Sequence, residues 1–468
     1  MSKIEVNQVD TQCGSTLTLG SSGKTVTLAS GASQSGFGRT GTVDWCTTAK
    51  TSPLTVASGN GYFINTSGGA ITITLPASPS AGDIVAFKDY ANTWDTNNVT
   101  LARNGSKING VCSCGNLNTE SQSVTLIYVD GTKGWQDIHD STSDVTGAAY
   151  IAASGGNTTI TCGDFKTHIF TADGTFCVSS VGNSAGSNSV EYFVVAGSGA
   201  SGRSGDLSGY ASGGGGAGGF RLRSTAPGSN SPLNASTNVP VTATGFPVTV
   251  GGGGAQYTNG SNSVFSTITS AGGGVGGINA PSGPNDDRVK GANGGSGGGG
   301  GSYNPGCTPG PGGTGNTPPV TPPQGNDGGT GASAFSNTVG GGGGGAGAAG
   351  ANGAPVPTGA GGNGGIGSYI ADPFIGPTAP SYGTPGPVSS VRYFAGGGGG
   401  GSGYPSGTGC GGSGGAGGGG AGGGPAPTPT GTAGTVNTGG GSGGSRGNPA
   451  TNAVAGASGI VMIRYKFQ

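Results

Sequence analysis

Two patterns of apolar positions divide this chain. Up to residue 142, short stretches alternate apolar with polar residues, as in Ile71, Ile73 and Leu75. Alternation with a period of two is typical of a strand with one buried face. After residue 142, apolar stretches of similar length are separated by long runs of glycine. We therefore expect an all-β chain with essentially no α-helix, built from an alternating part and a glycine-rich part.

Residues 1–45 form the first predicted unit, a short β segment. Ser15–Gly20 and Lys24–Ala29 match each other and alternate threonine with leucine or valine. Two strands of this length cannot bury a core alone. We expect the segment to associate with other copies of itself in a β-stalk, and a disordered arm is the alternative.

Residues 46–142 are predicted to form a β-sandwich or small barrel. Turn residues such as Asn104-Gly105 and Asp130-Gly131 separate short strands at roughly ten-residue spacing, which is typical of these folds. We expect Trp94, Trp135 or both in the core, because residues of this size dominate core burial. A sugar-stacking role is the alternative for them. The strand candidates are residues 61–65, 70–75, 83–89, 98–102, 123–129 and 135–138.

Residues 143–468 form the glycine-rich unit, and apolar segments interrupt it. The last of these, 460–467, would promote aggregation if it were unpaired. Its expected partner is 190–196, and that pairing would bring the two ends of the unit side by side. The predicted strands are residues 166–170, 175–179, 190–196, 220–223, 246–250, 264–269, 390–395 and 460–467.

The glycine has an unusual distribution. All but 18 of the 113 glycines follow residue 150, in solid runs such as 340–345 and 396–401. Collagen is excluded because it needs glycine at every third position. A flexible low-complexity tail is one alternative. The other is polyglycine II, in which threefold helices rising about 3.1 Å per residue pack together and exchange hydrogen bonds. We expect this ordered bundle, capped by the β-strands.

Four connecting segments are longer than turns require: 281–290, 302–326, 368–391 and 403–410. Proline stiffens them, and aromatic residues on rigid loops are suited to recognition. The alternative is that the aromatic residues fold back to cap the bundle. The candidate receptor-binding residues are Asp286, Asp287, Arg288, Tyr303, Tyr369, Phe374, Tyr382 and Tyr404.

Composition and charge limit the possible functions. The net charge is −1 and charged residues make up 8%, so no basic surface for nucleic acid is expected. No stretch of about 20 apolar residues is present to insert into a membrane, and the first residues lack a secretion signal, so we expect synthesis in a host cytoplasm. Eight cysteines and two histidines predict neither a metal site nor a cofactor. No glutamate follows Glu191 and the aspartates are scattered, so no catalytic residues are expected.

Four blocks, in order, carry a resemblance to a known family: Phe170–Phe176, Val190–Gly197, Gly213–Arg221 and Gly459–Phe467. Together they resemble the glycine-rich tail fibre and receptor-binding proteins of tailed bacteriophages, especially those of marine cyanobacteria. Lys3–Asn7 and Gly14–Leu19 are similar to the N-terminal segment of the same proteins. The resemblance implies a protein of the virion tail, usually a homotrimer, that binds the host surface.

The resulting hypothesis is a tail fibre or adhesin that is not an enzyme. Residues 1–45 would attach it to other virion tail proteins, 46–142 would be a spacer, and 143–468 would bind a cell-surface glycan or outer-membrane protein. One alternative is a structural tail or capsid decoration protein without receptor binding. Another is an ice-binding or extracellular matrix protein built on the same helices.

Overall fold

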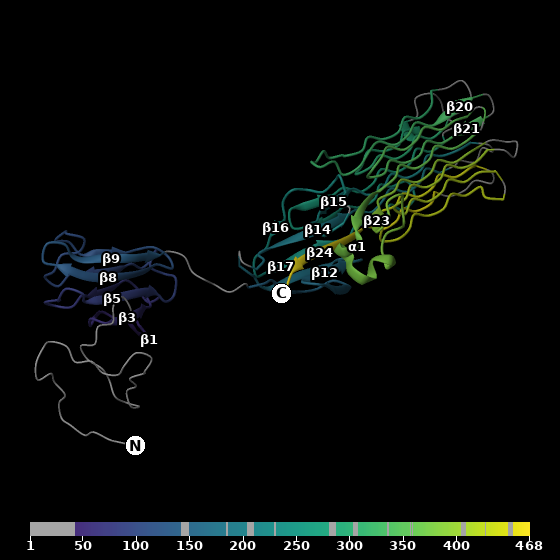
Figure 1. Cartoon of the computed structure of the whole chain (residues 1–468). Coiled ribbons are helices and arrows are strands. Elements are labelled where there is room, and N and C mark those ends of the chain that lie inside the picture. Colours follow the sequence, from purple (N-terminus) through teal and green to yellow (C-terminus); the bar gives the residue numbers. More distant parts are fainter. Residues whose placement is uncertain are drawn as a thin grey trace, which may run out of the picture. The chain divides into compact units, whose positions relative to one another are not determined.

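The computed structural model describes residues 43–141, 149–183, 186–203, 210–228, 231–279, 287–302, 308–334, 337–355, 357, 359–403, 409–425, 427–447 and 453–468. The chain divides into two compact units, Met1–Thr146 and Gly147–Gln468, which are treated separately below (Figure 1). The two strands predicted at 15–20 and 24–29 lie outside the described residues.

Two open sheets make up the described part of the N-terminal unit. One has the order β1-β3-β5-β8-β9 and the other β2-β4-β6-β7, and neither closes into a barrel. The strands are β1 (Asp44–Lys50), β2 (Leu54–Thr55), β3 (Asn60–Ile64), β4 (Ile71–Thr74), β5 (Ile84–Asp89), β6 (Val99–Ala102), β7 (Gly115–Leu117), β8 (Ser123–Asp130) and β9 (Gly134–Ser141).

The first six strands alternate between the two sheets. β1, β3 and β5 pair in parallel in one sheet, while β2, β4 and β6 pair in parallel in the other. Each successive pair of strands, one in each sheet, therefore forms one turn of the chain, and these turns stack with their strands parallel. β7, β8 and β9 complete the sheets in antiparallel pairing. The alternating sequence pattern predicted the strands but did not indicate this parallel connection.

One hydrophobic core lies between these sheets. Ile71, Ile73 and Leu75 are buried while Thr72 is exposed, as the period of two predicts. Trp94 and Trp135 are both fully buried, which confirms the prediction that the core contains at least one of them. Stacking of a sugar on either ring is incompatible with this burial.

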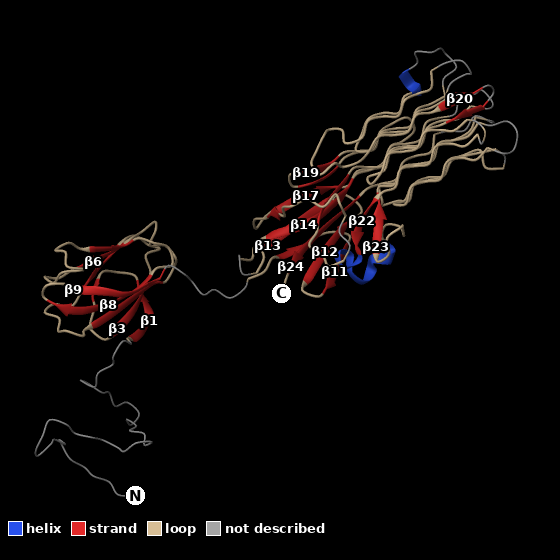
Figure 2. Ribbon diagram, turned by 45° about the horizontal axis from the view of Figure 1, so that its top comes forward, coloured by secondary structure: helices blue, strands red, loops and turns tan. Residues whose placement is uncertain are grey.

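The described residues of the C-terminal unit form two larger sheets and two hairpins. The sheet orders are β11-β12-β24-β14-β15, with β16 also paired to β14, and β10-β13-β17-β18-β19. Figure 2 shows the two larger sheets at one end of the unit, the glycine-rich runs extending from them, and β20 near the other end. The strands are β10 (Ala152–Ser154), β11 (Thr158–Cys162), β12 (Phe165–Phe170), β13 (Gly174–Ser180), β14 (Ser189–Val195), β15 (Phe220–Arg223), β16 (Val239–Pro240), β17 (Gly245–Thr249), β18 (Ser263–Phe265), β19 (Ile268–Ser270), β20 (Ala332–Ala334), β21 (Asn337–Val339), β22 (Ser368–Ala371), β23 (Val391–Phe394) and β24 (Ile460–Lys466).

The pairing of β14 with β24 confirms the predicted partnership of 190–196 with 460–467. The two strands are antiparallel, with Phe193 opposite Met462. Both faces of this pair are buried: Phe193 and Met462 contribute to one core, and Val194 and Val461 to another. Such strands are apolar along their whole length because neither face meets water.

The glycine-rich runs form threefold helices, as run 213–219 illustrates. Each residue of this run donates its backbone N–H to one of three neighbouring runs, and every third residue donates to the same neighbour. Three residues per turn is the geometry of polyglycine II. The acceptors lie in 271–277 for Gly213, Gly216 and Gly219, in 341–344 for Gly214 and Ala217, and in 439–442 for Gly215 and Gly218.

The absence of side chains permits this packing. A Cβ atom added to Gly343 would lie 2.0 Å from the carbonyl oxygen of Gly215, and one added to Gly398 would lie 2.0 Å from that of Ser442. Serine also occurs within the runs, and the Ser302 hydroxyl, for example, donates to the Ala211 carbonyl at 2.6 Å. The runs therefore form a hydrogen-bonded lattice in which the backbone itself is the core.

Helix is scarce in the described residues. It consists of α1 (Asp372–Ile375) and the 3-10 helices η1 (Asp287–Val289) and η2 (Gly376–Ser381). None of them has the length and apolar character needed to cross a membrane.

Candidate functional site

The glycine-rich unit has two ends, and the connections between runs are divided between them. The proximal end is at β14 and β24. The distal end is defined by Ala211, Ser302, Val339, Ser402 and Arg446, which adjoin one another: Ser302 N–H donates to Ala211 O at 3.1 Å, and β-bridges join Ala211 to Arg446 and Val339 to Ser402. Figure 1 shows the runs reaching this end, where the β20–β21 hairpin lies.

The segment after run 271–279 places a cluster of charged residues at the distal end. Asp287 and Lys290 form an exposed ion pair of 2.6 Å across η1, and Arg288 is exposed between them. The lattice holds η1 through its backbone, because Ile278 N–H donates to Arg288 O and Gly301 N–H donates to Val289 O. Two predicted site residues, Asp287 and Arg288, are thus presented on a fixed backbone.

Three other predicted site residues, Asp286, Tyr303 and Tyr404, lie outside the described residues. Their described neighbours can be placed. Ser302 precedes Tyr303 and is itself a distal-end residue, while Gly403 precedes Tyr404 and donates its N–H to Thr338 O on β21 at 2.8 Å.

The remaining three, Tyr369, Phe374 and Tyr382, belong to the proximal end. Tyr369 lies on β22 and its ring centroid is 5.3 Å from that of Tyr393. Phe374 is fully buried in the core beneath β14 and β24, and Tyr382 packs against the same core. The interpretation of 368–391 as one loop held clear of the core therefore needs correction. Its apolar residues cover the sheet face, as the fold-back alternative stated, and the site set is split between two ends.

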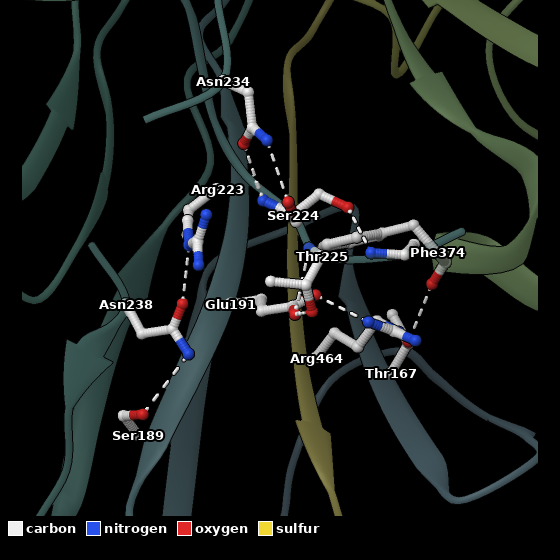
Figure 3. Close-up of polar contacts among 11 residues, drawn as sticks. Thr167, Ser189, Glu191, Arg223, Ser224, Thr225, Asn234, Asn238, Phe374 and Arg464 are labelled. Carbon is white, nitrogen blue, oxygen red and sulfur yellow. Dashed lines mark hydrogen bonds and ion pairs between the residues drawn. The ribbon is translucent and has the colours of Figure 1, made fainter. Parts of the chain in front are cut away.

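A second polar site lies at the proximal end and was missed in the sequence. Glu191 on β14 and Arg464 on β24 face each other and form a 2.7 Å ion pair, and both side chains are at least 95% buried. The Glu191 carboxylate also accepts hydrogen bonds from the backbone N–H and the hydroxyl of Thr225. Figure 3 shows these contacts beside a second group, in which Asn238 bridges Arg223 and Ser189. The available signal was that two apolar strands expected to pair carry opposite charges: Glu191 lies in one, and Arg464 and Lys466 lie in the other.

The surroundings of Arg464 stabilise its charge. Its guanidinium lies 3.6 Å from the centroid of the Phe165 ring and 5.7 Å from that of Phe374. Cation–π contacts of this kind gain strength when water is excluded. The Thr167 hydroxyl, next to Arg464 in the sheet, donates to the Phe374 carbonyl at 2.9 Å and fastens α1 over the pair.

A buried histidine lies on the opposite face of the sheet. His168 Nδ1 is 2.7 Å from the Gly155 carbonyl and Nε2 is 3.1 Å from the Tyr465 hydroxyl. Burial lowers the pKa of His168, and burial raises the pKa of Tyr465 to about 12. A neutral imidazole can donate through Nδ1–H to Gly155 and accept at Nε2 from Tyr465, which links β12 to the C-terminal strand β24.

Side chains of the kinds that bind metals or form disulfides also occur within the described ranges. These ranges contain no group of three or more His, Cys, Asp or Glu residues that could hold a metal ion. The six described cysteines are unpaired; Cys112, Cys114, Cys177 and Cys410 are exposed, and Cys46 and Cys162 are half-buried.

Comparison with known families gives a match to the glycine-rich part of the chain. A family model described as a glycine-rich domain matches residues 170–466, which begin at the end of β12 and end in β24. The match therefore spans the glycine-rich lattice together with the β14–β24 pair that closes it. No curated protein matches the chain.

Proposed function

The chain belongs to the glycine-rich domain family, and on this premise we propose that it is a tail fibre or adhesin of a tailed bacteriophage that binds a host-cell surface. The observation that carries the proposal is the lattice: it anchors several connecting segments at one distal end. The proposed activity is binding of a surface glycan or outer-membrane protein, without catalysis.

Rigid anchoring supports recognition for an energetic reason. A segment whose two ends are held in place has less conformational freedom to lose on binding than one whose ends are free. At the distal end, the residues that flank each connection are hydrogen-bonded to neighbouring runs, as Ser302 is to Ala211 and Gly403 is to Thr338. Weak contacts by such loops would be multiplied by several copies on one virion.

The arrangement of the resembling blocks also supports the proposal. Val190–Gly197 supplies β14, Gly213–Arg221 supplies a central run and the start of β15, and Gly459–Phe467 supplies β24. These three strands are neighbours in one sheet. The blocks that resemble phage tail proteins therefore form one continuous structural unit rather than scattered similarities.

Self-association is assigned in this proposal to the N-terminal part. In the described C-terminal unit, the large exposed apolar side chains are Tyr257 and Val436, on separate turns. The N-terminal unit exposes more of them: Trp45, Tyr90, Val111, Val129 and Ile138. We place the contacts of a homotrimer, and attachment to other virion tail proteins, in that unit and in the segment that precedes it.

The test is binding of the fluorescently labelled full chain to a panel of marine cyanobacterial strains, measured by flow cytometry. We expect saturable binding to a subset of strains. The double variant Tyr303→Ala/Tyr404→Ala should reduce it at least tenfold, because aromatic anchors carry much of the binding energy of an interface.

The matched control is Tyr257→Ala. Tyr257 is exposed on a turn beside the middle of run 196–202, since Ala200 N–H donates to Thr258 O. Its replacement should leave binding unchanged. If the chain is present in virion tails but binds no strain that the virion infects, the structural alternative replaces the receptor-binding proposal.

A further inference from the structure

A polar pocket opens at the proximal end, where β12 begins and β24 ends. Its volume is about 300 Å³, and it is lined by Phe165, Asn188, Ser189, Glu191, Asn238 and Arg464, among others. This volume is at the lower limit of small-molecule sites, which range over ~300–1,000 Å³. The volume suits a small ligand with a single ring and is too small for an extended oligomeric ligand.

The floor of the pocket contains the buried ion pair. Removing two charges from water costs several kcal/mol per ion, and apolar residues of similar size would often be at least as stable. The pair is also incompletely satisfied: Arg464 is 3% exposed, and its Nε finds no hydrogen-bond partner in the described residues. A buried donor without a partner is costly. Because this Nε is itself shielded from solvent, a ligand would contact the groups at the rim above the ion pair.

The rim supplies further hydrogen-bonding groups in fixed positions. Asn238 Oδ1 accepts from Arg223 Nε at 2.7 Å, and Asn238 Nδ2 donates to the Ser189 hydroxyl at 3.3 Å. These contacts fix the orientation of the amide and leave one of its N–H groups available. Asn188 is exposed beside Ser189, and its carbonyl is fixed by Val241 N–H at 3.2 Å.

The charges around the pocket favour a neutral ligand. Glu191 neutralises Arg464 at 2.7 Å, and Lys466 lies 3.8 Å from Asp164. The half-buried Phe165 ring adds an apolar wall to the amide and hydroxyl groups. A ligand ring that carries hydroxyl groups and exposes C–H faces would match both: its hydroxyls suit the amide and hydroxyl groups, and its C–H faces suit the apolar wall.

We propose that this pocket binds one neutral hexose-sized sugar unit. The ring would pack against the part of the Phe165 side chain that Arg464 leaves uncovered, and its hydroxyls would bond to Asn188 and Asn238. The pocket is at the opposite end of the unit from the distal loops. This inference and the receptor-binding proposal can therefore fail independently.

The experiment is saturation-transfer difference NMR on the full chain with free glucose, galactose and mannose, each at millimolar concentration. We expect saturation transfer to at least one of the three. Asn238→Ala should weaken its affinity about tenfold, and Asn188→Trp, which places a large side chain at the mouth, should abolish the signal. Near-UV circular dichroism checks that both variants remain folded.

Two controls distinguish binding in this pocket from binding elsewhere on the chain and from attraction of an anion. Asn116→Ala, at an exposed asparagine on β7 of the N-terminal unit, should leave the signal unchanged. Sodium glucuronate and inorganic phosphate serve as anionic probes and should bind more weakly than the hexose. The proposal is overturned if no hexose gives a signal, if folded Asn188→Trp retains it, or if glucuronate binds more tightly.

Discussion

Replacement of one central glycine by alanine tests the lattice directly. Gly343 donates its N–H to Gly398 O at 2.8 Å, and Gly398 in turn donates to Gly215 O at 3.0 Å. A Cβ on Gly343 would lie 2.0 Å from that same Gly215 oxygen. The three runs that meet here must therefore separate by more than 1 Å before the methyl group reaches ordinary contact distance (roughly 3.4 Å for carbon and oxygen).

The expected loss of stability follows from three contributions. Overpacking a dense core costs about 1–3 kcal/mol. Separation of the runs breaks the hydrogen bond from Gly398 to Gly215 and leaves buried groups unsatisfied, at about 1–3 kcal/mol. Alanine restricts the unfolded chain, which returns about 0.4–1 kcal/mol. We expect Gly343→Ala to destabilise the C-terminal unit by about 1–6 kcal/mol.

The matched control is Gly252→Ala. No atom lies within 4 Å of a Cβ built on Gly252, and its φ is not in the left-handed region. Only the effect on the unfolded chain remains there, so stability should be unchanged or higher by about 0.4–1 kcal/mol. The two substitutions are chemically identical, and their predicted effects have opposite signs.

Amide hydrogen exchange followed by mass spectrometry is the suitable assay, because it reports on separate segments. Peptides from runs 213–219, 340–346 and 395–402 should exchange faster in Gly343→Ala than in Gly252→Ala. The internal reference is tryptophan fluorescence: all three tryptophans, Trp45, Trp94 and Trp135, lie in the N-terminal unit, whose unfolding should not change. Equal exchange in the two variants would refute close packing of the runs.

Three further outcomes are expected. Phe374→Ala should destabilise the C-terminal unit by about 3–5 kcal/mol in urea titration, because it empties a core position, whereas a surface role would leave stability nearly unchanged. Glu191→Ala should lower the free energy of unfolding by about 3–5 kcal/mol in the same titration, because it leaves Arg464 buried and unpaired. The double variant Glu191→Leu/Arg464→Met should recover most of this stability. A double variant as unstable as Glu191→Ala would contradict a simple ion-pair role. Because burial lowers the pKa of His168, the stability that the neutral side chain contributes is fully present above its unfolded-state pKa of about 6.5 and is lost as the pH falls toward the folded-state pKa. The unfolding midpoint temperature measured by calorimetry should therefore fall on acidification. In His168→Gln it should fall less steeply.

The strands could be predicted where the local pattern is strong. Residues 220–223 were predicted with the observed bounds, and the pairing of 190–196 with 460–467 followed from their uninterrupted apolar character. Residues 264–269 were predicted as one strand and instead form a hairpin, β18 and β19, because Ser266 adopts a positive φ of 53°. Nothing in a single serine signals that conformation.

The location of the candidate site could not be predicted for a different reason. Whether a connecting segment lies at the proximal or the distal end depends on how many times the chain has reversed direction before it. Several reversals lie inside glycine-rich sequence, such as those near 346–349 and 416–419, where glycine and alanine give no turn signal. Ser368–Ala371 was therefore grouped with the loops, although Ile370 is fully buried in β22.

The three-residue period of the lattice has a genetic consequence. In a threefold helix each residue is rotated by about 120° from the last, so an insertion of one or two residues would turn every later donor in that run toward the wrong neighbour. An insertion or deletion of three codons would preserve all these directions and change only where the following loop emerges. Natural length variation within these runs should therefore occur in steps of three residues, while the loops themselves should vary by any number.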